Sequence, residues 1–360
     1  MSAPAERTAA GRRGRAPDAV GAALLAGCAV WALISTAGRE ARPEGVLLAV
    51  LAVTTGYVVG RISGSLVPVA TASAMALLWL AGALASSQET FDTAVSVAAP
   101  PGDSGAVAAL LVLGGGAACC AGTGARRASG RLALRLLALV IAGCALLLGS
   151  VVGFLATLGV LLCSLAAARL RGRILWLAGY ALITALIVGT SWAVAERALP
   201  EGLTASLEGQ LTQHRVELWH DAAELAKERP GRGIGPDRFG DLSPTVSRSL
   251  DDDGKPHSAP LQQAAEQGVV GVVLLGALFG WLLYVLGRSP CSTPVILTAG
   301  AALTALAAVA TVGNALSFTQ VTAGAGLLAG LATARPAART GPGAPPEPAG
   351  STRTGAPAEV

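Results

Sequence analysis

Residues 269–287 read VVGVVLLGALFGWLLYVLG and contain no charged side chain. At about 1.5 Å of rise per residue, a helix of this length crosses the ~30 Å hydrocarbon core of a bilayer. Nine other stretches of similar length and composition predict further spans. The ten predicted spans are residues 18–37, 45–60, 65–84, 104–122, 132–148, 151–168, 174–195, 268–287, 294–311 and 318–334.

The overall composition agrees with this interpretation. Of the 360 residues, 52% are hydrophobic and 13% are charged, and the mean hydropathy is +0.59. Water-soluble domains carry about 25% charged residues, so the composition excludes that class. We therefore predict an all-α fold, a polytopic transmembrane helical bundle of about ten spans with one long, partly helical external loop.

Basic residues gather on one side of the predicted membrane. They precede the first span at Arg7, Arg12, Arg13 and Arg15, and they then occupy alternate loops at Arg61, Arg126, Arg127, Arg131, Arg169, Arg171, Arg173, Arg288 and Arg335. By the positive-inside rule this side is cytoplasmic, as are both termini. We therefore predict a multi-pass protein of the plasma membrane. Its first span is expected to be a retained signal anchor, and a signal peptide cleaved near Ala37 is the alternative.

The predicted spans divide the chain into five parts. These are a basic cytoplasmic N-terminus (1–17), spans one to seven (18–195), an extracellular loop with the candidate active-site residues (196–262), spans eight to ten (263–334) and a disordered cytoplasmic tail (335–360). The tail is rich in proline and poor in large apolar residues, which is typical of disorder.

The loop of residues 196–262 concentrates the chemistry of the chain. It holds 12 of the 22 acidic residues and all three histidines, His214, His220 and His257. By contrast, we find no ionisable residue well inside any predicted span, and ion-coupled transporters usually need one. No pair of Cys or His has the spacing of metal ligands in a shared compartment, so we expect neither a metal nor another cofactor.

One helix is predicted within this loop, over residues 203–228, stopped by Pro230 and Gly231. Its apolar stripe consists of Leu207, Leu211, Leu218, Ala222 and Leu225. Arg215 lies in or beside this stripe, four residues before Trp219. Such an arginine is either a side chain that snorkels to the membrane surface or a cation held for an anionic ligand.

The polar side of the same helix is expected to be solvated. His220 points away from the stripe, whereas His214 flanks it and stays undecided. The acidic residues of this helix recur at helical spacing and predict a solvated face, with a cation site as the alternative. They are Glu217, Asp221, Glu224 and Glu228.

Three alternate glycines, Gly231, Gly233 and Gly235, follow the helix. They do not form a dinucleotide fingerprint, because no strand precedes them and no helix starts on the last glycine. They predict a turn, and the alternative is a bare backbone that a large substrate can approach closely.

His257 directly precedes the predicted start of the eighth helix. Ser258 is suited to the N-cap and Pro260 to the first turn. The histidine would then lie at the external mouth of a membrane helix, where the positive end of the helix dipole favours anionic groups. Gln262, Glu266 and Gln267 extend this helix as a polar outer turn.

The order of these motifs resembles a known pattern. Arg215-x-x-x-Trp219 is followed by Pro230-x-x-Gly233-x-Gly235-Pro236-x-x-Phe239 and by His257-Ser258-x-x-Leu261-x-x-x-x-Glu266-x-Gly268-x-x-Gly271. This order, placed before the last three spans, is similar to the long external loop of the O-antigen ligase and O-antigen polymerase superfamily. The similarity is closest over residues 205–285.

The resemblance implies a metal-independent membrane glycosyltransferase of the cell envelope, of the kind used in exopolysaccharide biosynthesis. Such an enzyme transfers or polymerises a glycan from a donor linked to polyprenyl pyrophosphate, for example undecaprenyl pyrophosphate, at the outer face of the membrane. The partners implied are this donor, a glycan or lipid acceptor and membrane lipids, with no nucleic acid. The resemblance does not separate polymerase from ligase.

The resemblance also assigns residue roles. His257 inherits the catalytic role toward the acceptor hydroxyl, and Arg215 inherits the binding of the pyrophosphate. A neutral imidazole can accept the acceptor proton, while a guanidinium stabilises charge on the departing pyrophosphate. The predicted substrate-binding residues are Arg215, Trp219, Arg232, Arg238 and Glu266.

The sequence departs from the family pattern before the loop. The family carries a Ser-Arg-Gly stretch there, whereas the nearest counterpart here is Ser150-Val151-Val152-Gly153. Because Val151 cannot bind phosphate, either another arginine substitutes, such as Arg197, Arg232 or Arg238, or the protein is a divergent or inactive relative. Outside the enzyme class, the alternatives are a transporter of polysaccharide or lipid-linked glycan and a catalytically degenerate membrane scaffold.

Overall fold

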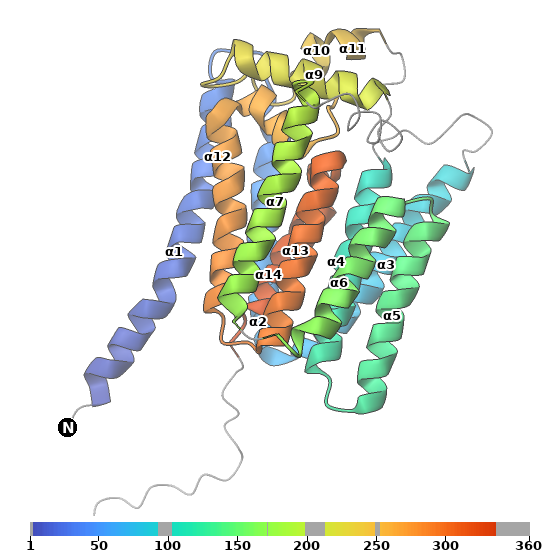
Figure 1. Ribbon diagram of the computed structural model, residues 1–360. Helices are drawn as coiled ribbons and strands as arrows, with labels where there is room; N and C mark the ends of the chain where they lie inside the picture. The colour runs from blue at the N-terminus through green and yellow to red at the C-terminus, as the bar shows by residue number, and fades with distance from the viewer. Residues whose placement is uncertain (1–2, 93–102, 171, 199–212, 249–252, 336–360) are drawn as a thin grey trace, which may run out of the picture.

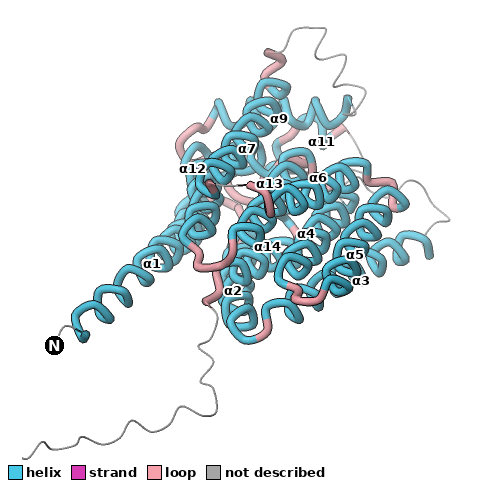
Figure 2. Tube along the Cα trace, turned by 60° about the horizontal axis from the view of Figure 1, so that its bottom comes forward, coloured by secondary structure: helices cyan, strands magenta, loops and turns pink. Residues whose placement is uncertain are grey.

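The computed structural model describes residues 3–92, 103–170, 172–198, 213–248 and 253–335. These residues form helices and connecting loops, and no strand occurs among them (Figure 2). The helices are α1 (Ala3–Thr36), α2 (Glu44–Leu66), α3 (Pro68–Asp92), α4 (Asp103–Gly124), α5 (Ala128–Leu147), α6 (Val151–Ala167), α7 (Arg173–Ala195), α9 (Gln213–Glu228), α10 (Phe239–Leu242), α11 (Pro244–Ser247), α12 (Ala259–Arg288), α13 (Thr293–Val312), the 3₁₀ helix η1 (Ala315–Ser317) and α14 (Thr319–Ala332).

The predicted polytopic helical bundle is confirmed. Each of the ten predicted spans coincides with a helix, and eight of the described helices are long and apolar enough to cross a membrane. The other two are shorter, since α6 has 17 residues and α14 has 14. The predicted disordered tail lies outside the described residues, apart from Arg335.

The long helices run side by side, and α9 lies across one end of them (Figure 1). We call this end, where α10 and α11 also lie, the α9 end. Helices α1 and α12 form one side of the bundle, α3 and α5 form the opposite side, and α4, α13 and α14 lie between them (Figure 2). Helices α9, α10 and α11, which belong to the candidate loop, lie outside this parallel arrangement.

Helix α4 lies at the centre of the bundle. Its side chains are apolar and mostly small, so that none of its faces is polar. Burial on all faces is expected for a helix without a polar face. Its Gly115 and Gly116 allow neighbours to approach closely: an added Cβ would lie 2.4 Å from Cγ2 of Thr157 and 2.5 Å from Cβ of Ala302. These contacts hold α6 and α13 against α4.

Helices α2 and α14 pack backbone against backbone. A Cβ added at Gly60 would lie 2.2 Å from the Leu327 carbonyl oxygen, and one added at Gly330 would lie 2.2 Å from the Tyr57 carbonyl oxygen. Small residues four apart on facing helices are the usual means of close packing in membranes, where no hydrophobic effect drives helices together. The two backbones are thus held closely together, and α1 packs against α2 and α12.

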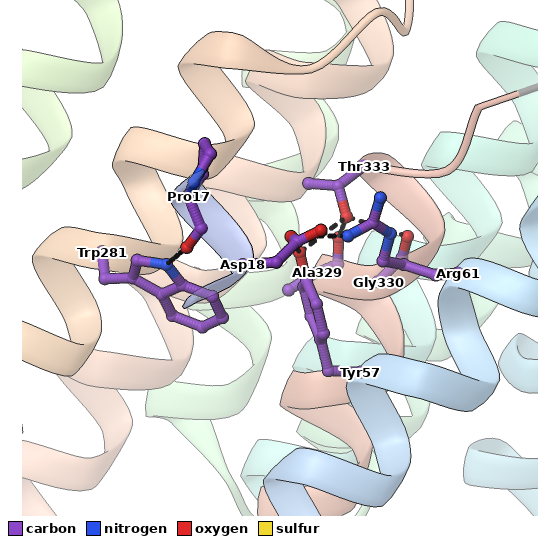
Figure 3. Close-up of polar contacts among 8 residues, drawn as sticks. All are labelled: Pro17, Asp18, Tyr57, Arg61, Trp281, Ala329, Gly330 and Thr333. Carbon is purple, nitrogen blue, oxygen red and sulfur yellow. Dashed lines mark hydrogen bonds and ion pairs between the residues drawn. The ribbon is translucent and has the colours of Figure 1, made fainter. Parts of the chain in front are cut away.

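A polar cluster joins four helices at the end opposite α9 (Figure 3). The Arg61 guanidinium of α2 pairs with the Asp18 carboxylate of α1 at 2.6 Å, and Trp281 of α12 donates its indole N–H to the Pro17 carbonyl at 2.8 Å. Thr333, just after α14, contacts Tyr57 at 3.5 Å. The second span was expected to end at residue 60, but its helix continues to Leu66, so Arg61 lies inside α2.

Candidate active site

Helix α9 covers the bundle with its apolar stripe. Leu218, Ala222 and Leu225 are buried, as predicted, against Leu261 and Ala265 of α12. Leu207, Leu211 and the first part of the predicted helix lie outside the described residues. The helix ends at Glu228, directly before Arg229-Pro230-Gly231, as the proline predicts.

Arg215 and Trp219 lie one turn apart on α9 in different environments. Trp219 is 1% exposed, and its indole N–H has no hydrogen-bond partner among the described residues. Arg215 is half-buried, and burial lowers the pKa of its guanidinium. Within the described part of the chain, no hydrogen bond or ion pair involves this guanidinium. Toward the described residues its N–H donors are therefore unused.

The polar side of α9 is less solvated than predicted. His220 places Nδ1 3.0 Å from the Ala195 carbonyl oxygen at the end of α7, so the expectation of a solvated histidine is wrong. Asp221 accepts hydrogen bonds from the Ser243 hydroxyl at 2.6 Å and from the Thr245 backbone N–H at 2.9 Å. These contacts fix α7 and α11 to α9, and at Asp221 the acidic face is structural.

The predicted glycine turn packs against α12. Gly233 and Gly235 have positive φ angles of 63° and 107°. Gly235 donates its N–H to the Glu266 carbonyl at 2.9 Å, and a Cβ added at Gly233 would lie 2.3 Å from the Glu266 carbonyl carbon. The bare backbone of Gly233 and Gly235 therefore admits neighbouring protein groups, and the predicted turn is confirmed; the alternative of a close approach by a substrate stays a prediction.

The glycine turn meets α12 at a break in that helix. Gly268 has φ 68° and ψ −165°, which interrupts the helical backbone. The groups freed by the break find partners: the Val269 N–H donates to the Pro230 carbonyl at 2.8 Å, and Trp31 of α1 donates to the Gln267 carbonyl at 3.0 Å. The break leaves a short half-helix, residues 259–267, ahead of the long apolar part of α12.

His257 lies at the start of this half-helix. Its φ is 51°, in the left-handed region of the backbone that residues other than glycine rarely adopt, and the exposed fraction of its surface is 4%. Ser258 takes the N-cap position and Pro260 the first turn, as predicted, but the Ser258 hydroxyl makes no capping bond. Strained backbone of this kind is concentrated at functional sites, because the surrounding structure has to maintain it.

The imidazole of His257 pairs with Asp253, which the sequence analysis did not identify. Nε2 lies 3.3 Å from Oδ1 of Asp253, and Nδ1 is buried without a hydrogen-bond partner among the described residues. A proton on Nε2 satisfies the carboxylate and leaves the Nδ1 lone pair unused. This is the arrangement of a base that an adjacent carboxylate orients.

The surroundings of Asp253 favour the ionised form of its carboxyl group. Burial raises the pKa of its carboxyl, but the hydrogen bond and charge of His257, with the backbone N–H and charge of Lys255, lower it overall. The carboxylate therefore stays ionised above the ordinary pKa of about 4, and its stabilising contact is lost only as the pH falls through the lowered value.

If His257 is the base that the resemblance implies, Asp253→Asn should slow the implied transfer reaction at least about tenfold, an increase of ~1.4 kcal/mol in the activation barrier. The amide removes the charge and can donate to Nε2, which favours the wrong tautomer of His257. Rates and thermal unfolding of both proteins at pH 5–8 provide the test. A variant as fast as the wild type would show that Asp253 does not orient the imidazole.

Glu266 lies at the other end of the half-helix. Its exposed fraction is 4%, and its carboxylate accepts hydrogen bonds from the Gln262 amide at 3.2 Å and from the Asp237 backbone N–H. Its side chain thus supports the residues that follow the glycine turn. A direct role of Glu266 in binding substrate stays a prediction.

The predicted arginines Arg232 and Arg238 lie close enough to Arg39 to lower its pKa, as does Arg229. Arg39 and Arg229 were not among the predicted site residues. Arg39, in the loop between α1 and α2, donates to the Gly233 carbonyl at 2.6 Å. Burial lowers the pKa of Arg39, and so do the charges of Arg232, Arg229 and Arg238. We call these four residues the arginine cluster. Arg39 is 194 positions from Gly233 in the chain, so no local pattern could have revealed it.

Ser150 and Val151 occupy the position at which the family carries its upstream serine and arginine. Ser150 caps α6 by accepting the Gly153 N–H at 3.1 Å, and Val151, the first residue of α6, is exposed. Arg197, an alternative anion ligand, is exposed just after α7 and has a φ of 54°. The arginine cluster does not include it.

Comparison with known proteins gives one match. The family model described as O-antigen ligase matches residues 136–276, which contain α6, α7, α9, His257 and the break in α12. Neither a curated protein nor a solved structure is significantly similar to this chain. The resemblance seen in the sequence is thus confirmed, together with its membrane-embedded, glycan-transferring type of function. The chain is a multi-pass membrane protein whose residues 136–276 belong to the O-antigen ligase family.

Proposed function

We propose that this protein transfers or polymerises a glycan from a polyprenyl-pyrophosphate-linked donor at the outer face of the membrane. The observation that carries the proposal is the buried His257, held with a left-handed backbone beside Asp253 and with Nδ1 unused. A merely structural histidine would be expected to use both ring nitrogens when buried.

In the proposed reaction the acceptor hydroxyl gives its proton to Nδ1 of His257 as its oxygen attacks the anomeric carbon of the donor sugar. The bond between that carbon and the pyrophosphate oxygen breaks, and the electron pair leaves with the polyprenyl pyrophosphate. Arg215 stabilises the charge that develops on this leaving group, because a guanidinium can contact two phosphate oxygens at once. The proton on His257 then passes to solvent.

The proposed face of the membrane follows from the distribution of arginines. The loops at the end opposite α9 carry Arg126, Arg127 and Arg169, whereas the residues around α9 have mixed charge. By the positive-inside rule, the α9 end then faces outward. A membrane-impermeant thiol reagent applied to intact cells should label a cysteine introduced at the exposed Glu224 and not one at the exposed Arg126.

Arg215 offers a sharp test of the proposed leaving-group contact. We expect Arg215→Ala to lower the rate of glycan joining about 100-fold or more, since oxyanion-type contacts contribute 10²–10³-fold. Arg215→Lys keeps the charge but loses the two-pronged contact, so it should recover only part of that loss. The assay incubates purified protein with a synthetic lipid-linked oligosaccharide and follows chain length.

Arg248→Gln serves as the matched control, because Arg248 is an exposed arginine of the same loop outside the arginine cluster. It should keep the wild-type rate. Equal rates for wild type and Arg215→Ala would remove Arg215 from the proposed mechanism. If lipid-linked precursors instead accumulate at the inner leaflet of cells that lack the protein, the protein is a transporter.

A further inference from the structure

The Ser258 hydroxyl occupies a capping position without capping its helix. The Ser258 backbone begins the α12 half-helix with φ −151° and ψ 111°, yet the hydroxyl accepts no N–H of the first turn. Two other serines in the same position do cap: Ser150 accepts a hydrogen bond at 3.1 Å at the start of α6, and Ser243 accepts one at 3.3 Å at the start of α11. In both cases the donor is the N–H of the third residue after the serine, as is usual for an N-cap. At Ser258 this bond is left unmade.

The same hydroxyl is buried without a partner. Ser258 is 1% exposed, and its Oγ has no hydrogen-bond partner among the described residues. An unpaired buried hydroxyl is unfavourable, because its bonds with water are lost without replacement. Three threonines in this condition, Thr157, Thr298 and Thr304, lie within helices, where rotation of the side chain can bring the hydroxyl to a carbonyl of the preceding turn. Ser258 begins its helix and has no preceding turn.

The residue before Ser258 carries a second unpaired atom. Nδ1 of His257 is likewise buried and without a partner in the part of the chain that the structure describes. Consecutive Cα atoms are ~3.8 Å apart, so one ligand of the size of a sugar ring can reach both side chains. In an extended chain consecutive side chains point to opposite faces, but His257, with a φ of 51°, is not extended.

The chemistry of the two atoms is suited to a sugar. With the proton on Nε2 toward Asp253, Nδ1 of His257 can only accept a hydrogen bond, whereas the Ser258 hydroxyl donates one and accepts others. A fully ionised phosphate offers acceptors alone and therefore cannot satisfy Nδ1. Two neighbouring hydroxyls of a sugar ring satisfy both atoms, since one donates to Nδ1 and the other exchanges a hydrogen bond with Ser258.

We propose that the Ser258 hydroxyl binds the acceptor, through a second hydroxyl next to the one that donates to Nδ1 of His257. The inference rests on the proposed function and adds the chemical class of the acceptor to it. The acceptor is a carbohydrate with two neighbouring hydroxyls rather than a simple alcohol. Because Ser258 holds the second hydroxyl, it determines which hydroxyl of the sugar faces the base.

The kinetic test compares purified wild type with Ser258→Ala and Ser258→Cys. The acceptor is a short oligosaccharide prepared from the surface glycan of the producing cells, varied in concentration against a fixed amount of lipid-linked donor. We expect Ser258→Ala to raise the KM for the acceptor about three- to tenfold with a smaller change in kcat, since a binding contact is lost and the base remains.

Ser258→Cys distinguishes the hydroxyl from its volume. The thiol fills nearly the same space but forms only weak hydrogen bonds, so the acceptor KM should rise as it does for Ser258→Ala. Ser247→Ala is the control, because Ser247 is an exposed serine of the same loop, and it should keep the wild-type KM.

Thermal unfolding in detergent separates acceptor binding from a structural role. Ser150→Ala removes a capping bond and should lower the unfolding temperature by about 2 °C. Ser258→Ala removes an unpaired hydroxyl, so it should be as stable as the wild type or more stable.

Two outcomes would overturn the inference while leaving the proposed function intact. One is a wild-type acceptor KM in both Ser258 variants, and the other is a Ser258→Ala protein that unfolds as early as Ser150→Ala. Wild-type protein that joins no glycan in this assay would instead remove the proposed function, and the role of Ser258 with it.

Discussion

Replacing His257 by alanine should lower the rate of glycan joining by about 10²- to 10⁴-fold, the usual contribution of a general base. The variant loses the Nδ1 lone pair and the contact with Asp253 at 3.3 Å. Its amount in the membrane should change little, because the α12 half-helix is held by the glycine turn and by Trp31 rather than by the imidazole.

The measurement is the length of the surface glycan in cells, together with the location of the lipid-linked precursor. With His257→Ala, precursors should accumulate at the outer leaflet while joined glycan disappears. His220→Gln is the control, since His220 contacts the end of α7 and lies outside the His257–Asp253 pair. Undiminished glycan joining by His257→Ala would rule out its role as base, and precursors held at the inner leaflet would point to transport.

Gly268→Ala should be the most damaging single substitution for the structure around the site. A Cβ at this position would lie 2.5 Å from the Pro230 carbonyl oxygen, and the φ of 68° with ψ −165° belongs to a region essentially restricted to glycine. The strain of the backbone alone costs about 1–3 kcal/mol, and the collision adds to it. We expect a clearly lower unfolding temperature and loss of glycan joining.

Gly276→Ala is the matched control, because Gly276 lies in the same helix and a Cβ there would meet nothing within 4 Å. Alanine exceeds glycine in helix propensity by about 1 kcal/mol, so this variant should be as stable as the wild type or more stable. The comparison is made by thermal unfolding in detergent. Equal unfolding temperatures for the two variants would show that the break in α12 is not required.

The sequence was sufficient for features that depend on local composition. Apolar stretches of about 20 residues predict the positions of the long helices, because a helix satisfies its own backbone hydrogen bonds within a bilayer. Proline and serine near residue 258 predict the start of α12, and Pro230 predicts the end of α9. The burial of Leu218 and Ala222 follows from helical spacing alone.

Features created by contacts between distant segments could not be predicted. Gly268 shares α12 with other glycines, such as Gly276 and Gly280, whose backbone remains helical. What distinguishes Gly268 is the contact of its surroundings with the glycine turn. Arg39 reaches the site from the far end of the sequence. His220 was assigned to solvent because the helical wheel contains no information about where α7 ends. Asp253 lies four residues before His257 in a run of three aspartates, and nothing in the local sequence distinguishes it from the other two.

The most direct test counts the products formed by purified protein in lipid vesicles supplied with lipid-linked oligosaccharide. The proposed chemistry requires one polyprenyl pyrophosphate released for each new glycosidic bond, and neither product with His257→Ala. Wild-type protein that moves the lipid-linked oligosaccharide across the bilayer without lengthening the glycan or releasing pyrophosphate would contradict it.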